Sequence, residues 1–142
     1  MTLHDSIGYL INQTGRRMSQ YLSFYFGPYD ITPEQWGLLN QLAEKDGISQ
    51  KTLACRVEKD QTNVTRILDQ LERKGLVERK PNAEDRRSFL TYVTKEGREL
   101  SERLVPIEAQ CMKEAEKGLT EEDLTRLKQI LKRISQNIDN LR

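Results

Sequence analysis

The sequence has few of the residues on which metal binding and catalysis usually depend. It contains one histidine, His4, and two cysteines, Cys55 and Cys111, which lie far apart in the chain. This spacing indicates neither a zinc site nor a disulfide framework. The chain also lacks a serine, histidine and acid constellation and a glycine-rich phosphate loop. We therefore expect no metal site, no cofactor and no enzymatic activity.

Long hydrophobic runs and charge of a single sign are missing too. No apolar run approaches the roughly 18 residues that span a bilayer. The N-terminal segment 1–5 lacks the basic start of a secretory signal, so we expect a cytoplasmic protein. The formal net charge is only +1. A chain of 142 residues that is 36% hydrophobic fits one domain, 1–142, with a thin core, which favours a partner subunit.

The charge that is present gathers in the middle of the chain. Residues 49–98 hold twelve basic and eight acidic side chains, whereas residues 1–48 hold three and five and residues 99–142 hold eight and nine. This local basic excess is compatible with a nucleic-acid surface. Ordinary solvated charge is the alternative on this evidence alone.

Residues 61–74, behind Asp60 as a cap, carry the clearest amphipathic pattern. Four apolar residues recur at the i, i+3, i+4, i+7 spacing of a helix that packs on one face: Val64, Ile67, Leu68 and Leu71. The polar residues near the start of the opposite face are Gln61, Thr62, Asn63, Thr65 and Arg66. This pattern is typical of a recognition helix, whose first residues reach base edges in the major groove while its apolar side stays docked.

A basic hairpin is predicted directly after this helix. Residues 76–80 and 88–93 favour strands, and residues 81–87 between them favour a charged loop. Near the tip lie Asp85, Arg86 and Arg87. Arginine can enter a narrow minor groove there, while the carboxylate steadies a neighbouring arginine. A surface loop with compensating charges is the alternative. Helix and hairpin together predict a DNA reader with a wing.

Helices with apolar seams flank this reader. The first, about 4–26, and the last, after Thr120, repeat apolar residues at alternating steps of three and four. Shorter helices begin behind Thr32 and Ser49, and a long one begins behind Thr94. We interpret the seams as a dimer interface formed by Ile7, Ile11, Met18, Leu127, Leu131, Ile134, Ile138 and Leu141. Packing within one subunit is the alternative.

Several residues around the recognition helix can bind DNA. Gln and Asn can pair with adenine and Arg with guanine, each worth about 1 to 3 kcal/mol of discrimination. Any of the five polar residues can equally meet a phosphate or water. The predicted phosphate contacts are Ser49, Gln50, Lys51, Arg73, Lys74, Arg79 and Lys80. Such contacts set register rather than sequence preference, and solvated surface is the alternative for each lysine.

These elements resemble the MarR (multiple antibiotic resistance regulator) family of winged-helix repressors over nearly the whole chain. The matching segments are Ile31–Trp36, Asn63–Arg66, Leu71–Arg79, Asp85–Arg87 and Val93–Gly97. Each segment alone is weak, but their combination is specific. The resemblance implies a mainly α fold with a small β-hairpin wing. In it a winged helix-turn-helix, 31–98, lies between dimerisation helices, 1–30 and 99–142.

The resemblance also implies how the chain acts. It implies a two-fold dimer, interlocked through its first, fifth and sixth helices, that binds a pseudo-palindromic operator. Transcription is usually blocked until a small molecule or an oxidant changes the spacing of the two readers. Arg87 corresponds to the residue that the family inserts in the minor groove, with Asp85 as its positioning partner. Arg86 is then a phosphate contact.

A small aromatic or phenolic effector is a further expectation from the resemblance, because family members often bind such acids between the dimerisation helices and the reader. The candidate residues are Tyr9, Gln13, Arg17, Tyr21 and Trp36. Core or interface packing is the alternative for each. The first helix has no cysteine, so peroxide sensing of the kind some relatives use is not expected. Cys55 and Cys111 are expected to be structural core residues.

The leading hypothesis is a homodimeric, sequence-specific DNA-binding transcriptional regulator, most simply a repressor. The alternative is a winged-helix module that binds protein without touching DNA. The polar start of the recognition helix and the arginine-tipped wing argue against it, because protein interfaces favour aromatic anchors. Steep salt dependence of binding to duplex DNA separates the two hypotheses.

Overall fold

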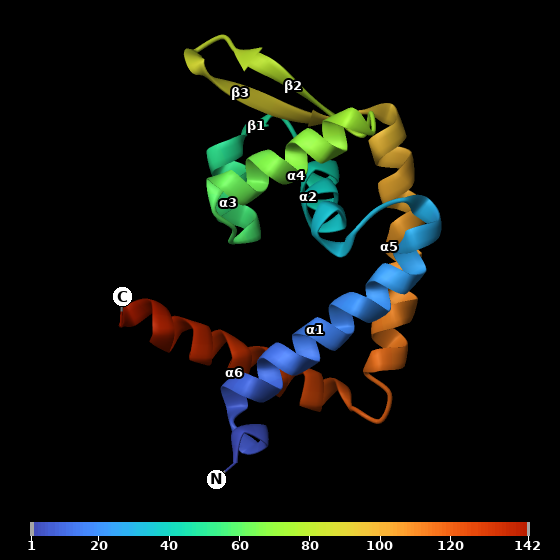
Figure 1. Ribbon diagram of the computed structural model, residues 1–142, viewed down its shortest axis with the longest axis vertical. Helices are drawn as coiled ribbons and strands as arrows, with labels where there is room; N and C mark the ends of the chain where they lie inside the picture. The colour runs from blue at the N-terminus through green and yellow to red at the C-terminus, as the bar shows by residue number, and fades with distance from the viewer. Residues whose placement is uncertain (1, 142) are drawn as a thin grey trace. The chain divides into compact units, whose positions relative to one another are not determined.

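The computed structural model describes residues 2–141 (Figure 1). It is mainly helical with one small antiparallel sheet, as predicted. In chain order the elements are η1 (Leu3–Asp5), α1 (Ile7–Phe26), η2 (Gly27–Tyr29), α2 (Pro33–Glu44), β1 (Ile48–Ser49), α3 (Gln50–Val57), α4 (Gln61–Arg73), β2 (Val77–Asn82), β3 (Asp85–Val93), α5 (Lys95–Ala115) and α6 (Glu121–Asn140). They form two compact units, one up to Ala109 and one from Gln110 onward. Across the described residues, no helix has both the length and the apolar character needed to cross a membrane.

The sheet of the first unit has the strand order β1-β3-β2, with both pairs antiparallel. Strand β1 is very short and is not predicted by the sequence pattern; it pairs Ile48 with Thr91 of β3. The turn before it is held at two points. The N–H of Gly47 donates to the carbonyl of Thr91 (2.7 Å), and the Asp46 carboxylate accepts the N–H of Val93 (3.1 Å). Gly47 has a φ of 72°, which glycine adopts without a Cβ penalty.

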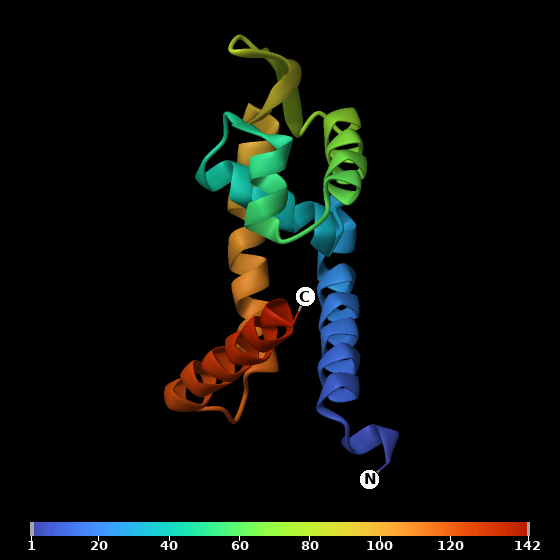
Figure 2. The same cartoon turned by 90° about the vertical axis from the view of Figure 1, so that its left-hand side faces the viewer.

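The wing hairpin has longer strands than the sequence predicts. The expected charged loop over residues 81–87 is wrong, because β2 and β3 continue through most of it and leave only a short turn. Two side chains close this turn. The Asn82 amide oxygen accepts the N–H of Glu84, and the Asp85 carboxylate accepts the N–H of Arg87, both at 3.0 Å. Asn and Asp favour turns through such bonds, and the strand pairing therefore extends close to the tip (Figure 2).

The core of the first unit is built on the apolar stripe of α4. Val64, Ile67, Leu68 and Leu71 are fully buried, as their spacing predicts. They form one cluster with side chains from neighbouring elements. The other large side chains that are fully buried in this core are Phe26, Leu38, Leu39, Leu42, Leu53, Val77 and Leu104. Burying one such side chain contributes about 1.5 to 3 kcal/mol, so the core holds α4 with its polar face outward.

The caps confirm several helix starts that the sequence predicts. Thr32 and Gln35 form a reciprocal capping box at α2. Ser49 and Asp60 accept backbone N–H bonds at the starts of α3 and α4. Each cap is worth roughly 1 kcal/mol. Capping depends on residues only three positions apart, which is why the sequence alone locates these helix starts.

The first helix begins later than predicted. The sequence predicts a helix from His4, whereas α1 begins at Ile7, after the short 3-10 turn η1. Ser6 has an extended backbone, with φ −70° and ψ 130°, and separates the two. The Asp5 carboxylate accepts bonds from the N–H (3.3 Å) and hydroxyl (3.0 Å) of Thr2. These bonds close η1 as a turn of its own.

The start of α5 packs tightly against the residue before the wing. The Thr94 hydroxyl caps α5 by accepting the N–H of Gly97 (3.0 Å), and it donates to the carbonyl of Gly75 (2.7 Å). A Cβ on Gly97 would lie 2.0 Å from the carbonyl oxygen of Leu76. Only glycine fits at this position without moving the backbone. The sequence predicts the Thr94 cap but carries no signal for this close approach.

The second unit contains the end of α5 and all of α6. Thr120 caps α6, as predicted. None of the described residues of α6 is buried. Leu127, Leu131 and Ile138 are 46%, 39% and 53% exposed, and Ile134 is half-buried. The predicted seam on this helix is therefore largely open in the single chain.

The two cysteines lie in different environments. Cys111 is buried, as predicted, whereas Cys55 is exposed, so its prediction as a core residue is wrong. Leu53 and Ala54 fill the inward side of the short helix α3, which leaves Cys55 on the outer side. Among residues 2–141, no group of three or more His, Cys, Asp or Glu side chains is placed to hold a metal ion.

Candidate nucleic-acid interface

The polar start of α4 is exposed while its apolar stripe faces the core. Gln61, Thr62 and Asn63 are all exposed. The Asp60 carboxylate accepts the backbone N–H of Asn63 (2.8 Å) and also its side-chain amide (2.9 Å). One acid thus caps the helix and orients the Asn63 amide. The first turn of α4 is presented as a recognition helix requires.

Thr65 is less accessible than the sequence predicts. Its side chain is half-buried. Its hydroxyl donates to the carbonyl of Gln61 (2.8 Å) and accepts from the amide of Gln50 (2.8 Å). Because Gln50 belongs to α3, this bond ties the first turns of the two helices together. Base contact by Thr65 stays a prediction, although this side chain already has two partners.

Arg66 is paired with a residue of α2. Its Nη2 donates to the Glu34 carboxylate (3.0 Å) and, over a longer distance, to the amide oxygen of Asn63 (3.4 Å). Glu34 lies 32 positions away in the chain, and nothing in the sequence pattern indicates that it reaches α4. Glu34 is therefore a residue of the candidate interface that the sequence does not predict.

The wing presents two exposed arginines, Arg86 and Arg87, at the start of β3. The Asp85 carboxylate bonds the backbone N–H of Arg87, so it steadies the turn from which both side chains leave. The Asn82 amide donates to the Ser88 hydroxyl across the hairpin (3.1 Å). Insertion of Arg87 in a minor groove stays a prediction, and the ordered turn is compatible with it.

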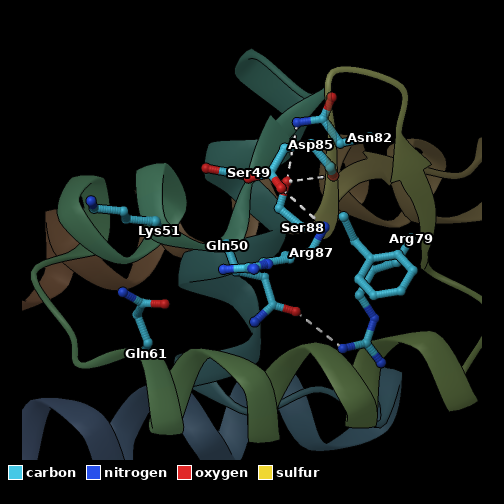
Figure 3. A pocket seen from close by; sticks show the side chains of 10 residues that line it. Ser49, Gln50, Lys51, Gln61, Arg79, Asn82, Asp85, Arg87 and Ser88 are labelled. Atoms are coloured by element: carbon cyan, nitrogen blue, oxygen red, sulfur yellow. Dashed lines mark hydrogen bonds between the residues drawn. The ribbon is translucent and has the colours of Figure 1, made fainter.

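The wing and the first turns of α3 and α4 border an open cleft (Figure 3). Its volume is about 620 Å³. The lining residues are Ser49, Gln50, Lys51, Gln61, Arg79, Asn82, Asp85, Arg87, Ser88 and Phe89. Residues predicted separately for the recognition helix, the wing and the DNA backbone thus meet on one face.

Arg79 lines this cleft and connects the wing to the reader helices. Its guanidinium donates to the carboxylates of Asp69 and Glu72 on α4 and to the amide oxygen of Gln50 on α3 (3.2 Å). The bond to Glu72 (3.0 Å) raises the pKa of Arg79 and lowers the pKa of the Glu72 carboxyl. The Arg79 side chain is only 19% exposed. A phosphate contact by Arg79 would have to share the guanidinium with two carboxylates.

Two lysines with predicted phosphate contacts also have partners within the chain. Lys74, at the end of α4, donates to the Gln35 amide oxygen (2.9 Å) and to the carbonyl of Asp30. Since Gln35 is buried, this connection anchors the end of α4 to the start of α2. The Lys80 ammonium lies 5.1 Å from the centroid of the Tyr92 ring. The Lys80 side chain is 60% exposed, whereas that of Lys74 is only 27% exposed. Contacts of both lysines with DNA stay predictions.

The remaining predicted phosphate contacts lie at helix ends. Ser49 accepts the N–H of Thr52 as the cap of α3 (3.1 Å). Lys51, in the first turn of α3, and Arg73, in the last turn of α4, are exposed. Such positions suit contacts that set the register of a protein on DNA.

The residues expected to line an effector crevice lie on α1 and α2. Tyr9, Gln13 and Tyr21 are half-buried, and Arg17 is exposed. Trp36 is buried in the core of the first unit. The effector crevice therefore stays a prediction. For Trp36, the structure shows core packing, which was the alternative to an effector contact.

Known proteins of similar sequence and structure point to one family. Residues 31–89 match the model of the MarR family. The chain is 31% identical over 129 residues to the multiple antibiotic resistance protein MarR of Escherichia coli (strain K12), an alignment covering 90% of each chain. It is 37% identical over 111 residues to the HTH-type transcriptional regulator YdgJ of Bacillus subtilis (strain 168), covering 78% of this chain and 68% of the relative. The crystal structure of the S. aureus MepR–DNA complex is similar with a TM-score of 0.87 and 27% identity, covering 93% of this chain and 98% of that one.

Proposed function

The chain belongs to the MarR family, and from this premise we propose that it is a homodimeric, sequence-specific DNA-binding regulator of transcription, most simply a repressor. The observation that carries the proposal is the single face on which the exposed start of α4, the start of α3 and the wing meet. A helix and a wing on one face can enter adjacent grooves of a duplex.

The proposal gives each part of this face a role. Gln61, Thr62 and Asn63 read base edges in the major groove, where their side chains have suitable donors and acceptors. Arg87 enters the neighbouring minor groove, and Arg86 binds a phosphate. Contacts with the DNA backbone then hold the reader in register without adding sequence preference.

The homodimer is proposed from the open apolar surfaces of two helices. On α6, Leu127 and Leu131 are exposed, and on α1, Ile7, Ile11 and Met18 are exposed. A second copy of the chain would cover such surfaces with a two-fold, self-complementary interface. Two readers related by a two-fold axis bind a pseudo-palindromic operator, with half-sites about one helical turn apart.

Repression follows most simply from occupancy, because a dimer on an operator excludes other proteins from the same DNA. Relief by a signal requires a ligand or modification that favours a dimer whose two readers are wrongly spaced. We propose a small aromatic or phenolic effector for this role. We also propose that the protein acts in the cytoplasm, as a DNA-binding regulator of the MarR family.

A protein-binding winged helix is the alternative function. It would use the wing or the exposed side of α4 as a contact surface for another protein. The exposed residues of the first turn of α4 are polar rather than aromatic, whereas protein interfaces are enriched in aromatic anchors. The DNA-binding proposal therefore has the stronger support.

Selection from a pool of random duplexes tests the proposal. The purified protein is incubated with the pool at about physiological salt, and bound duplexes are sequenced after several rounds. Recovery of an inverted repeat with half-sites about one helical turn apart would support the dimeric reader and provide its operator. A folded, dimeric protein that enriches no sequence would contradict the proposal and favour the protein-binding module.

A further inference from the structure

We propose that Glu34 is a specificity-determining residue of the DNA reader. It holds the guanidinium of Arg66 in one place and thereby limits the non-specific attraction of the recognition helix for phosphates. This inference rests on the proposed DNA-binding function. Glu34 lies on α2, whereas all the residues predicted to contact DNA lie on or beside α3, α4 and the wing.

The geometry places Glu34 beside the polar side of the recognition helix. Helices α2 and α4 pack side by side (Figure 1), and Glu34 lies in the first turn of α2. Its Oε2 accepts a bond from Nη2 of Arg66 at 3.0 Å. The same Nη2 lies 3.4 Å from the amide oxygen of Asn63, whose amide group is itself bonded to Asp60. Arg66 is thus held between two groups on two helices.

The pair has little value for the stability of the fold. The side chains of Arg66 and Glu34 are 51% and 53% exposed. Ion pairs that are exposed to this extent contribute little to stability, because water screens them and both side chains lose freedom. The main effect of the pair is therefore to offset the charge of Arg66 and to fix the orientation of its guanidinium.

Arg66 is the cationic residue of the first two turns of α4, residues 61–67. Gln61, Thr62 and Asn63 in the same turns are uncharged, so Arg66 adds an attraction for phosphates of any sequence to the start of this helix. A carboxylate at hydrogen-bond distance offsets this attraction.

Holding Arg66 also favours recognition of one base over another. A guanidinium has five N–H donors, and Glu34 engages one nitrogen of the three. The other donors point from a fixed position, as bidentate pairing with a guanine edge requires. A guanidinium without this partner would turn to the nearest phosphate instead. Glu34 therefore lowers the affinity for DNA of any sequence and raises the ratio of operator to random affinity.

Replacement of Glu34 by Gln tests this role, with Glu44→Gln as the matched control. Glu44 is an exposed acid at the other end of the same helix, so the control changes the same charge far from Arg66. We expect E34Q to bind random duplex about fivefold more tightly, with a salt slope steeper by about one released ion. Operator affinity should change less, so that the ratio of operator to random affinity falls. E44Q should leave that ratio at the wild-type value.

The same measurements in an Arg66→Ala background separate positioning from a general charge effect. We expect E34Q to have no further effect on random-duplex affinity when Arg66 is absent. An equal gain in both backgrounds would show that Glu34 acts on DNA directly, and it would overturn the inference. Thermal unfolding of each variant shows whether the chains compared are folded to the same extent.

The outcome also distinguishes failure of this inference from failure of the proposed function. Wild-type protein that binds the operator specifically, together with an E34Q variant that matches E44Q, would overturn the role of Glu34 alone. Wild-type protein without specific duplex binding would overturn the proposed function and this inference with it.

Discussion

Helices α4 and α6 are both amphipathic, yet their apolar faces lie in opposite environments. Leu68 and Leu71 of α4 are completely buried, whereas Leu127 and Leu131 of α6 are 46% and 39% exposed. The face of α4 is covered by other elements of the same chain. The two helices therefore contribute to stability in different ways: α4 through the fold of one chain, and α6 through an association that we propose with a second chain.

A charge placed in the α6 seam should have the largest effect. Leu131→Asp would bury a carboxylate in the proposed interface, and an uncompensated buried charge costs about 3 to 5 kcal/mol. We expect monomeric or unfolded protein at micromolar concentration, measured by sedimentation and circular dichroism. Gln136→Asp, at an exposed position of the same helix, should stay dimeric. A stable dimer of Leu131→Asp would show that this seam is not the interface.

Truncation of a core residue in α4 should destabilise the single chain itself. Leu68→Ala removes a fully buried side chain and should lower the free energy of unfolding by about 2 to 5 kcal/mol. Denaturant titration measures this loss. The same truncation at Leu127 should instead lower the fraction of dimer, measured by sedimentation, and this loss should shrink as the protein concentration rises above the dissociation constant. An unchanged dimer fraction for Leu127→Ala, with an unfolding loss as large as that of Leu68→Ala, would contradict the contrast between the helices.

Replacement of an exposed wing residue should affect binding and leave the fold unchanged. Arg87→Ala should weaken operator binding by about 1 to 3 kcal/mol, if its side chain enters the minor groove. The unfolding curve should match that of wild type, because Arg87 is exposed. Arg103→Ala, which removes the same charge from an exposed position on α5, serves as the control. Unchanged operator affinity for Arg87→Ala would contradict a DNA contact by Arg87 in the wing.

The smallest expected effect is at the half-exposed pair formed by Glu72 and Arg79. Their bond lowers the pKa of the Glu72 carboxyl below its ordinary value of 4.5, so the folded chain binds fewer protons in acid than the unfolded chain. This contribution to stability is complete above about pH 4.5 and is lost as the pH falls through the lowered pKa. Glu72→Gln should cost less than about 1 kcal/mol at pH 7, since the side chain is 41% exposed.

Denaturant titrations of wild type and Glu72→Gln across pH 7 to pH 3 measure this difference. The two stabilities should converge toward the acid end. A difference that grows with acidity would have the wrong sign and would contradict the role assigned to the pair.

The sequence predicts those features that depend on residues within one or two helical turns. The stripe of α4, its Asp60 cap and the Thr32 capping box follow from local spacing, and the structure confirms them. The wing strands are longer than predicted because Asn82 and Asp85 close the turn with side-chain bonds. Charge alone does not distinguish a loop from a strand that is ordered in this way.

The contacts that shape the site join residues distant in sequence, and local pattern does not predict them. Arg79 meets Asp69 and Glu72 only because β2 packs beside α4. Glu34 reaches Arg66 only because α2 packs against α4. These pairings are set by tertiary packing. They change the interpretation of the site, because a cationic residue that the sequence predicts to contact DNA can already pair with an acidic residue of the same chain.

In the proposed complex, one dimer presents two readers to two half-sites at once. The most direct test compares affinity for the selected operator with affinity for a version that carries about five extra base pairs, half a helical turn, between its half-sites. We expect the lengthened operator to bind as weakly as a single half-site. Equal affinity for both operators at the same salt concentration would contradict the proposed complex.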